Sequence, residues 1–191
     1  LSIPVIKNIS FTITLLTLTL INPSLVFFVL ATNTASTNNK DTYIDGYSGN
    51  VNTNYGNNES LNLYNYATWQ IQRLLLNFTL PSLSGVISDV KLYTYCYNVG
   101  VAQDTSKYID IHQCLRNWTE AGATWNNYDG TNYWTSAGCS SAGNDYNSTI
   151  IDSINTISSA NQWRTFVLMG TGADNPLTLN WGDTVNLFIK A

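Results

Sequence analysis

A strict alternation of apolar and polar residues over short runs is the feature that most constrains how this chain folds. In residues 86–99, VISDVKLYTYCYNV, the set Val90, Leu92, Thr94 and Cys96 alternates with Lys91, Tyr93, Tyr95 and Tyr97. A period of two indicates a β-strand with one buried face, because successive side chains point to opposite sides of a sheet. Comparable runs recur along residues 41–191 between segments rich in Gly, Asn, Asp and Ser. This spacing predicts an all-β sandwich or barrel.

Two segments depart from simple alternation. Residues 71–80, IQRLLLNFTL, are almost continuously apolar, which predicts a strand in the core of the fold. Residues 149–160, TIIDSINTISSA, carry isoleucines at a spacing of three to four, which predicts one short helix despite many β-branched residues.

The first 34 residues form an apolar leader with Lys7 as their single charge. A signal peptide, a membrane span and a retained β-strand all remain open for it. As a strand, its apolar positions are Ile9, Phe11, Ile13 and Leu15, followed after a one-residue slip by Leu16, Leu18 and Leu20. A β-bulge absorbs such a slip. We therefore divide the chain into a leader (1–34), a linker (35–40) and a β-sandwich domain (41–191).

Charge is scarce in this sequence and carries no basic footprint. Charged residues make up 10% of the chain and the net charge is −4, whereas an ordinary soluble domain has about 25% charged residues. Asn, Thr, Ser and Tyr supply polarity instead, which gives a neutral surface rich in hydrogen-bonding groups. Nucleic acid is excluded as a partner, because its recognition needs clustered Lys and Arg.

Five Asn-x-Ser/Thr sequons, the first of them at Asn8, and three cysteines bear on the compartment of the protein. A secreted or cell-surface protein would carry N-linked glycans at the last four sequons. The candidate glycosylation sites are Asn58, Asn77, Asn117 and Asn147. For Cys96, Cys114 and Cys139, the count allows one bridge plus a free thiol, an intermolecular pair, or three buried thiols.

Three stretches, taken in order, resemble the DNRLRE-type extracellular β-sandwich domain. The first is DTYIDGYSGNVNTNYGNNESLNL (41–63), similar to an opening strand and an Asn-Tyr-Gly turn. The second is RLLLNFTLPSLSGVISDVKLYTY (73–95), similar to two strands joined by a Leu-Pro-Ser loop. The third is NWTEAGATWNNYDGTNYWTSAGC (117–139), similar to a Trp-x-Glu-x-x-x-Thr-Trp segment. The resemblance implies a non-catalytic, jelly-roll-like antiparallel β-sandwich, here with an N-terminal apolar extension.

The same resemblance implies two functions. Such domains usually continue through one more strand than this chain contains after DTVNLFIKA (183–191). A missing strand leaves an open sheet edge that another chain fills. Our first hypothesis is therefore an extracellular structural or surface protein that polymerises into filaments by donating its N-terminal strand to the next molecule. The alternative is a carbohydrate-binding module of a secreted protein, with a polysaccharide as partner.

Aromatic residues between 118 and 134 are the candidates for a sugar platform, because aromatic faces stack on sugar C–H groups. We assign Trp118 and Trp125 to the core, where large aromatics usually pack. Tyr128, Tyr133 and Trp134, in an expected loop, are the carbohydrate-binding candidates.

No arrangement in the sequence predicts an enzyme. Asp110, His112 and Cys114 alternate along one strand face, roughly 6.5–7 Å apart, which is too far for a nucleophile–base hydrogen bond, so we expect a solvated face. Glu120 and Asp129 form a carboxylate pair with no predicted separation. We expect no cofactor. The metal considered is a structural Ca²⁺ bound by Asp41 and Asp45 with Asp129 or Asp145.

Overall fold

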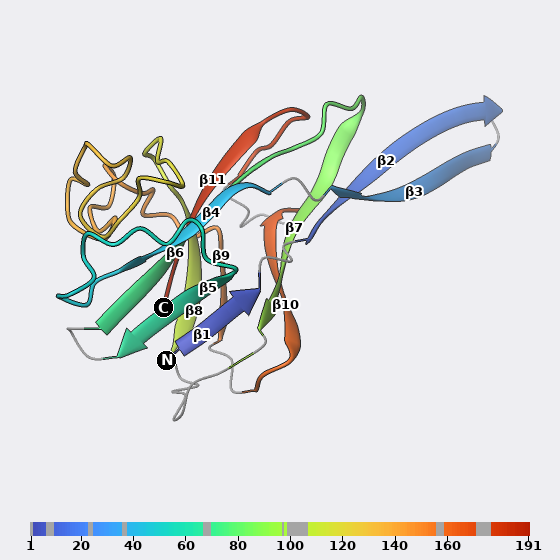
Figure 1. Cartoon of the computed structure of the whole chain (residues 1–191). Helices are drawn as coiled ribbons and strands as arrows, with labels where there is room; N and C mark the ends of the chain where they lie inside the picture. Colours follow the sequence, from blue (N-terminus) through green and yellow to red (C-terminus); the bar gives the residue numbers. More distant parts are fainter. Residues whose placement is uncertain are drawn as a thin grey trace.

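The computed structural model of the chain is all-β, which confirms the predicted fold class (Figure 1). It describes residues 2–6, 10–22, 25–35, 38–66, 70–96, 98, 107–155, 159–170 and 177–191. Within these residues no helix is long and apolar enough to cross a membrane. The strands are β1 (Ser2–Ile6), β2 (Ser10–Asn22), β3 (Leu25–Ala35), β4 (Asn38–Asp45), β5 (Ser60–Tyr66), β6 (Gln70–Thr79), β7 (Val86–Cys96), β8 (Tyr108–Gln113), β9 (Asp152–Asn155), β10 (Gln162–Met169) and β11 (Thr184–Lys190).

The strands pair antiparallel throughout and fold into two packed layers. One layer runs β4–β6–β11–β8–β9, and the other is centred on β7, which pairs with β10, β2 and β1. β5 joins the layers, because it pairs with β1 over most of its length and with β6 at its end. This is the antiparallel β-sandwich that the alternation predicted.

The main core lies between the two layers. Alternate residues of the strands whose side chains the structure describes point into it, including Val90 and Leu92 of β7, Phe166 and Leu168 of β10, and Leu187 of β11, all at most 3% exposed. Burial of apolar area on this scale is the dominant stabilising term of such a fold. The alternation seen in the sequence is thus the alternation between this core and the outer faces.

A second core lies on the outer face of the β6 layer, beneath the long connection from residue 114 to residue 151. This connection contains no strand, only isolated bridges such as Cys114 to Tyr146. The second core consists of Ile44, Leu75, Cys114, Trp118, Ala123, Trp134, Cys139 and Phe188. β6 is therefore buried on both faces, which is why residues 71–80 lack alternation and confirms them as a core strand.

The N-terminal segment forms strands that pair with the body of the same chain. β1 lies between β5 and β7, and β2 pairs along the first part of β7. β2 and β3 form a long hairpin that extends away from the sandwich (Figure 1). Of the proposed donor positions, Phe11, Ile13, Leu15, Leu16, Leu18 and Leu20 lie on β2, and Ile9 lies outside the described residues.

Local pairing near the expected bulge and linker also differs in detail from the prediction. The register between β2 and β7 shifts between Thr14 and Leu15, with Ser88 as the extra residue on β7. The irregularity therefore lies one residue earlier than the slip in the sequence. β4 begins at Asn38, inside the segment expected to be a linker.

The helix predicted over residues 149–160 is wrong. Asp152–Asn155 form β9, which pairs antiparallel with β8, and residues 156–158 lie outside the description. Ile154 packs against the main core while Ser153 and Asn155 are on the exposed side. The β-branched isoleucines fit this half-buried edge strand better than a helix, since a neighbouring strand supplies their backbone partners.

Candidate functional site

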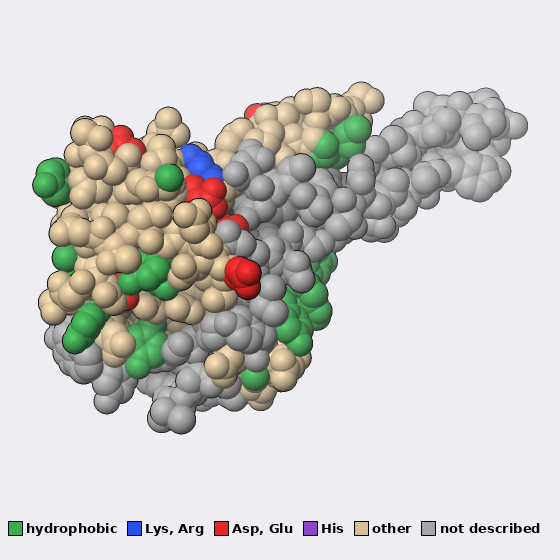
Figure 2. Space-filling model, in the orientation of Figure 1, with side chains coloured by type: hydrophobic (Ala, Val, Ile, Leu, Met, Phe, Trp, Pro, Cys, Tyr) green, Lys and Arg blue, Asp and Glu red, His purple; other side chains and the backbone are tan. Residues whose placement is uncertain are grey.

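The outer surface of β7 and β10 is a sheet face that carries aromatic residues. Because the alternate residues of both strands fill the main core, the remaining ones point outward. We call this set the β7–β10 face and define it as Lys91, Tyr93, Tyr95, Trp163, Thr165 and Val167. Figure 2 shows hydrophobic side chains exposed on the side of the molecule formed by β10.

Trp163 and Tyr95 form one end of this face. They are directly opposite each other in the antiparallel register, and their ring centroids are 5.2 Å apart with planes inclined at 58°. Trp163 is 54% exposed, which is unusual for so large an apolar side chain. The Tyr95 hydroxyl donates to the Asn161 side-chain oxygen at 3.3 Å, so it fixes the edge of the face. Two rings held at an angle, each with an open surface, are suited to contact a ligand from outside.

The charge on this face is internally balanced. Lys91 forms an ion pair of 2.7 Å with Asp89 on the same strand. The hydrogen bond to Asp89 raises the pKa of Lys91 above its ordinary value. The face therefore presents aromatic and hydroxyl groups rather than a free cation.

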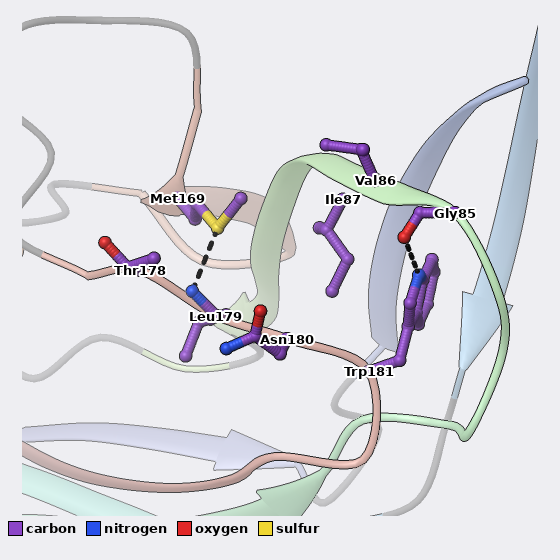
Figure 3. A pocket seen from close by; sticks show the side chains of 8 residues that line it. All are labelled: Gly85, Val86, Ile87, Met169, Thr178, Leu179, Asn180 and Trp181. Carbon is purple, nitrogen blue, oxygen red and sulfur yellow. Dashed lines mark hydrogen bonds between the residues drawn. The ribbon is translucent and has the colours of Figure 1, made fainter. Parts of the chain in front are cut away.

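A groove of about 480 Å³ lies at the opposite end of β7 (Figure 3). Its lining residues are Gly85, Val86, Ile87, Met169, Thr178, Leu179, Asn180 and Trp181. The Trp181 indole donates to the Gly85 carbonyl at 2.9 Å, and the Leu179 amide lies 3.3 Å from the Met169 sulfur. These polar groups are thus engaged within the wall. Met169, which lines the groove, is six positions after Trp163 on β10, so the groove begins roughly 20 Å along the strand from that ring.

The three aromatic residues proposed for sugar binding occupy different environments. Tyr133 is 73% exposed, whereas Tyr128 is half-buried and Trp134 is only 4% exposed. The Trp134 indole donates to the Thr124 carbonyl at 2.9 Å, and its ring lies 5.6 Å from that of Tyr128. Of the three, Tyr133 has the most exposed side chain and Trp134 the least. Trp118 is fully buried, as predicted.

Comparison with known protein families decides the kind of domain. A model of carbohydrate-binding module family 96 matches residues 32–185. The chain belongs to this family. No curated protein matches the chain significantly. The matched range contains β4 to β10, and therefore both the β7–β10 face and the connection over the second core.

Within this family 96 domain, the row Asp110, His112 and Cys114 was predicted to face solvent, but the structure buries two of its three residues. His112 is 2% exposed and Cys114 4%, because the connection that follows β8 folds back over them. His112 Nδ1 lies 3.0 Å from the Asn147 carbonyl oxygen and 3.2 Å from that of Thr149. Burial, with a smaller effect from Lys190, lowers the pKa of His112. A neutral histidine under this cover has no access to a substrate.

Three further acids considered in the sequence, Glu120, Asp129 and Asp45, accept hydrogen bonds from polar groups of the family 96 domain itself. Glu120 accepts from the Asp41 backbone, and Asp129 accepts from Asn132, whose backbone amide contributes most to lowering the pKa of Asp129. Asp45 is 3% exposed and accepts from the side chains of Asn50 and Gln72. Among the described residues, no three His, Cys, Asp or Glu side chains are grouped to hold a metal ion.

The candidate glycosylation sites differ in accessibility. Asn58, Asn117 and Asn147 are exposed. Asn77 is 4% exposed on β6, and its amide donates to the Asn186 side chain at 2.6 Å between two paired strands. A glycan on Asn77 would replace this bond and separate the strands. The three exposed asparagines are therefore the better candidates for glycosylation.

When the chain is expressed in a glycosylating host, we expect glycans on Asn58, Asn117 or Asn147 and an unmodified Asn77. The physical reason is that only an exposed amide accommodates a glycan in the folded domain. Glycopeptide mass spectrometry before and after enzymatic release of N-glycans measures occupancy at each site. Substantial occupancy of Asn77 in folded protein would contradict this expectation.

Proposed function

We propose that this family 96 domain binds a neutral polysaccharide on the β7–β10 face. The observation that carries the proposal is the exposed Trp163 ring set against Tyr95 on a sheet face outside the core. Sugar rings present C–H groups that stack on such aromatic surfaces, while Thr165 and Asn161 offer hydroxyl and amide groups to sugar hydroxyls. Tyr93 lies two residues before Tyr95, roughly 6.5–7 Å along the same strand, and extends the platform along one direction.

Charge favours a neutral glycan over an acidic one. The net charge of the chain is −4, and Lys91 on the face is already paired with Asp89. An acidic polysaccharide would have to compete for that lysine against a net negative protein. Binding by stacking and neutral hydrogen bonds does not meet this obstacle.

Two neighbouring surfaces rank lower for this role. Tyr133, with Asn132 beside it, remains a second candidate contact, with Tyr128 and Trp134 supporting its loop from inside. The groove of Figure 3 has its indole N–H bonded to Gly85 and lacks a second exposed ring. Neither places two aromatic rings together at the surface.

We further propose that the domain is of the DNRLRE type, that it is non-catalytic, and that it acts outside the cell or at its surface. The filament hypothesis requires the N-terminal strand to pair with a second molecule. No observation favours that exchange, because β1 and β2 pair with β5 and β7 of their own chain. Polysaccharide binding is therefore the better-supported function.

Replacing Trp163 with alanine is expected to weaken polysaccharide binding by about ten-fold or more, because it removes one well-packed aromatic contact. Stability should change little because the ring is half exposed. Pull-down on cellulose, chitin and xylan, with calorimetry on soluble β-glucan and xylan oligosaccharides, measures the affinity. An acidic glycan, such as pectin, is included to test the preference for neutral chains.

The matched control is Tyr108→Ala. Tyr108 is 56% exposed, also on a strand, but belongs to β8 in the other layer. Binding that is insensitive to Trp163→Ala but lost with Tyr133→Ala would move the site to the connection over the second core. If the unmodified domain bound none of the glycans tested, the proposed function would be overturned.

A further inference from the structure

Two of the three cysteines meet in the second core. Cys114 follows β8 and Cys139 lies late in the connection, and they are 4% and 0% exposed. Both sulfur atoms lie 3.7 Å from the same acceptor, the carbonyl oxygen of Asp145. Residues 25 positions apart in sequence are thus held with their sulfurs against one carbonyl group.

The backbone at Cys139 is held in an uncommon conformation. Its φ is 57°, in the left-handed region that few residues other than glycine adopt, and Gly138 before it has φ 77°. At the start of this left-handed pair, the backbone amide of Gly138 donates to the Trp125 carbonyl oxygen. The chain therefore turns the Cys139 side chain inward toward Cys114 at some conformational cost.

We propose that Cys114 and Cys139 form a disulfide bond that closes the segment 114–139 over the outer face of the sheet. Cys96 is the remaining free thiol. It lies on β7 in the main core, on the other side of the β6 layer, with its sulfur 3.3 Å from the Asn98 carbonyl oxygen. This assignment selects one bridge plus a free thiol among the arrangements that an odd cysteine count allows.

The oxidant in this proposal is a small-molecule disulfide such as glutathione disulfide. The Cys114 thiolate attacks it, forms a mixed disulfide and releases one glutathione thiolate, which takes up a proton. The Cys139 thiolate then attacks the Cys114 sulfur, forms the protein disulfide and releases the second glutathione. Two cysteine thiols are oxidised and one glutathione disulfide is reduced to two thiols.

Both steps precede the final packing of the connection. In the folded domain the two cysteines are at most 4% exposed, so glutathione disulfide has no access to them. Burial also raises the pKa of Cys139, which makes its thiolate unfavourable once the connection has packed. Both exchange steps therefore take place while residues 115–147 are still folding onto the sheet.

The direct test is refolding the whole chain with reduced and oxidised glutathione, trapping free thiols with iodoacetamide, and measuring the intact mass. The expected product is a monomer with one alkylated cysteine, and its peptide map contains a Cys114–Cys139 link with alkylated Cys96. Its melting temperature should fall by about 6–12 °C on reduction, since the bridge closes a loop of 25 residues. Three alkylated cysteines in the folded protein, or a link that includes Cys96, would overturn the proposal.

Two single variants serve as matched controls. Cys96→Ser should still form the Cys114–Cys139 link and leave no thiol to alkylate. Cys139→Ser should give two alkylated cysteines and a melting temperature that no longer depends on reductant. A Cys139→Ser protein that keeps the full reductant dependence would count against the bridge, and the mass of the unmodified chain decides the matter even if a variant does not fold.

Discussion

Trp118→Ala is expected to lower the free energy of unfolding by about 3–5 kcal/mol, the usual range for removing a buried large aromatic. Trp118 is fully buried, and it fills the space between the β6 layer and the connection above it. Lys40 lies over its ring at 4.6 Å and donates to its carbonyl group, so the side chain also positions β4. Urea unfolding followed by far-UV circular dichroism measures the loss without relying on tryptophan emission.

Trp118→Phe provides the control for this prediction. The Trp118 indole N–H is buried and has no hydrogen-bond partner among the described residues. Phenylalanine removes that unsatisfied donor together with part of the ring volume, and the two changes partly offset each other. We expect Trp118→Phe to be clearly less destabilising than Trp118→Ala. A loss below about 1 kcal/mol for Trp118→Ala would show that the second core is not a stabilising unit.

The alternation of residue types predicted the sandwich because it records which side of each strand is covered. It held along β7 and β10, where one face fills the main core. The same pattern contained a signal for the proposed binding face that the sequence-based prediction did not use. Trp163 occupies the polar phase of β10 beside Thr165, so a tryptophan there had to be exposed. The sequence-based prediction instead placed the sugar platform in a loop, where aromatic residues are close together in the sequence.

The connection between β8 and β9 could not be predicted from local patterns. Its residues are polar and rich in Gly, Asn and Ser, which is typical of an exposed loop. The structure packs this segment on the outer face of the sheet, which buries His112, Trp134 and Asp145. Their burial depends on pairing between residues far apart in the chain, such as Asn147 with Gln113. Periodicity within a strand contains no information about such a second cover.

Asp145→Asn is expected to cost roughly 2–4 kcal/mol at neutral pH, because it removes a buried charge from a complete set of partners. The Asp145 side chain is inaccessible to solvent and accepts from the backbone amides of Thr135, Ser136 and Ser141 at 2.9–3.2 Å. Arg116 Nε completes the set at 3.2 Å. Asparagine would turn an N–H donor toward these N–H groups, which leaves donors unpaired in the interior.

The pH dependence of stability distinguishes this role from a loss of packing. Burial alone would raise the pKa of Asp145, but the hydrogen bonds from these amides and from Arg116 outweigh it and hold the pKa below its ordinary value. A carboxyl group whose pKa is lower in the folded state stabilises the protein above its unfolded pKa of about 3.9, and this contribution is lost as the pH falls through the folded value. Urea unfolding from pH 7 to pH 3 should therefore show the stability difference between wild type and Asp145→Asn narrowing as the pH falls below about 4. Parallel curves for wild type and Asp145→Asn would refute an ionised, hydrogen-bonded Asp145 at the centre of this connection.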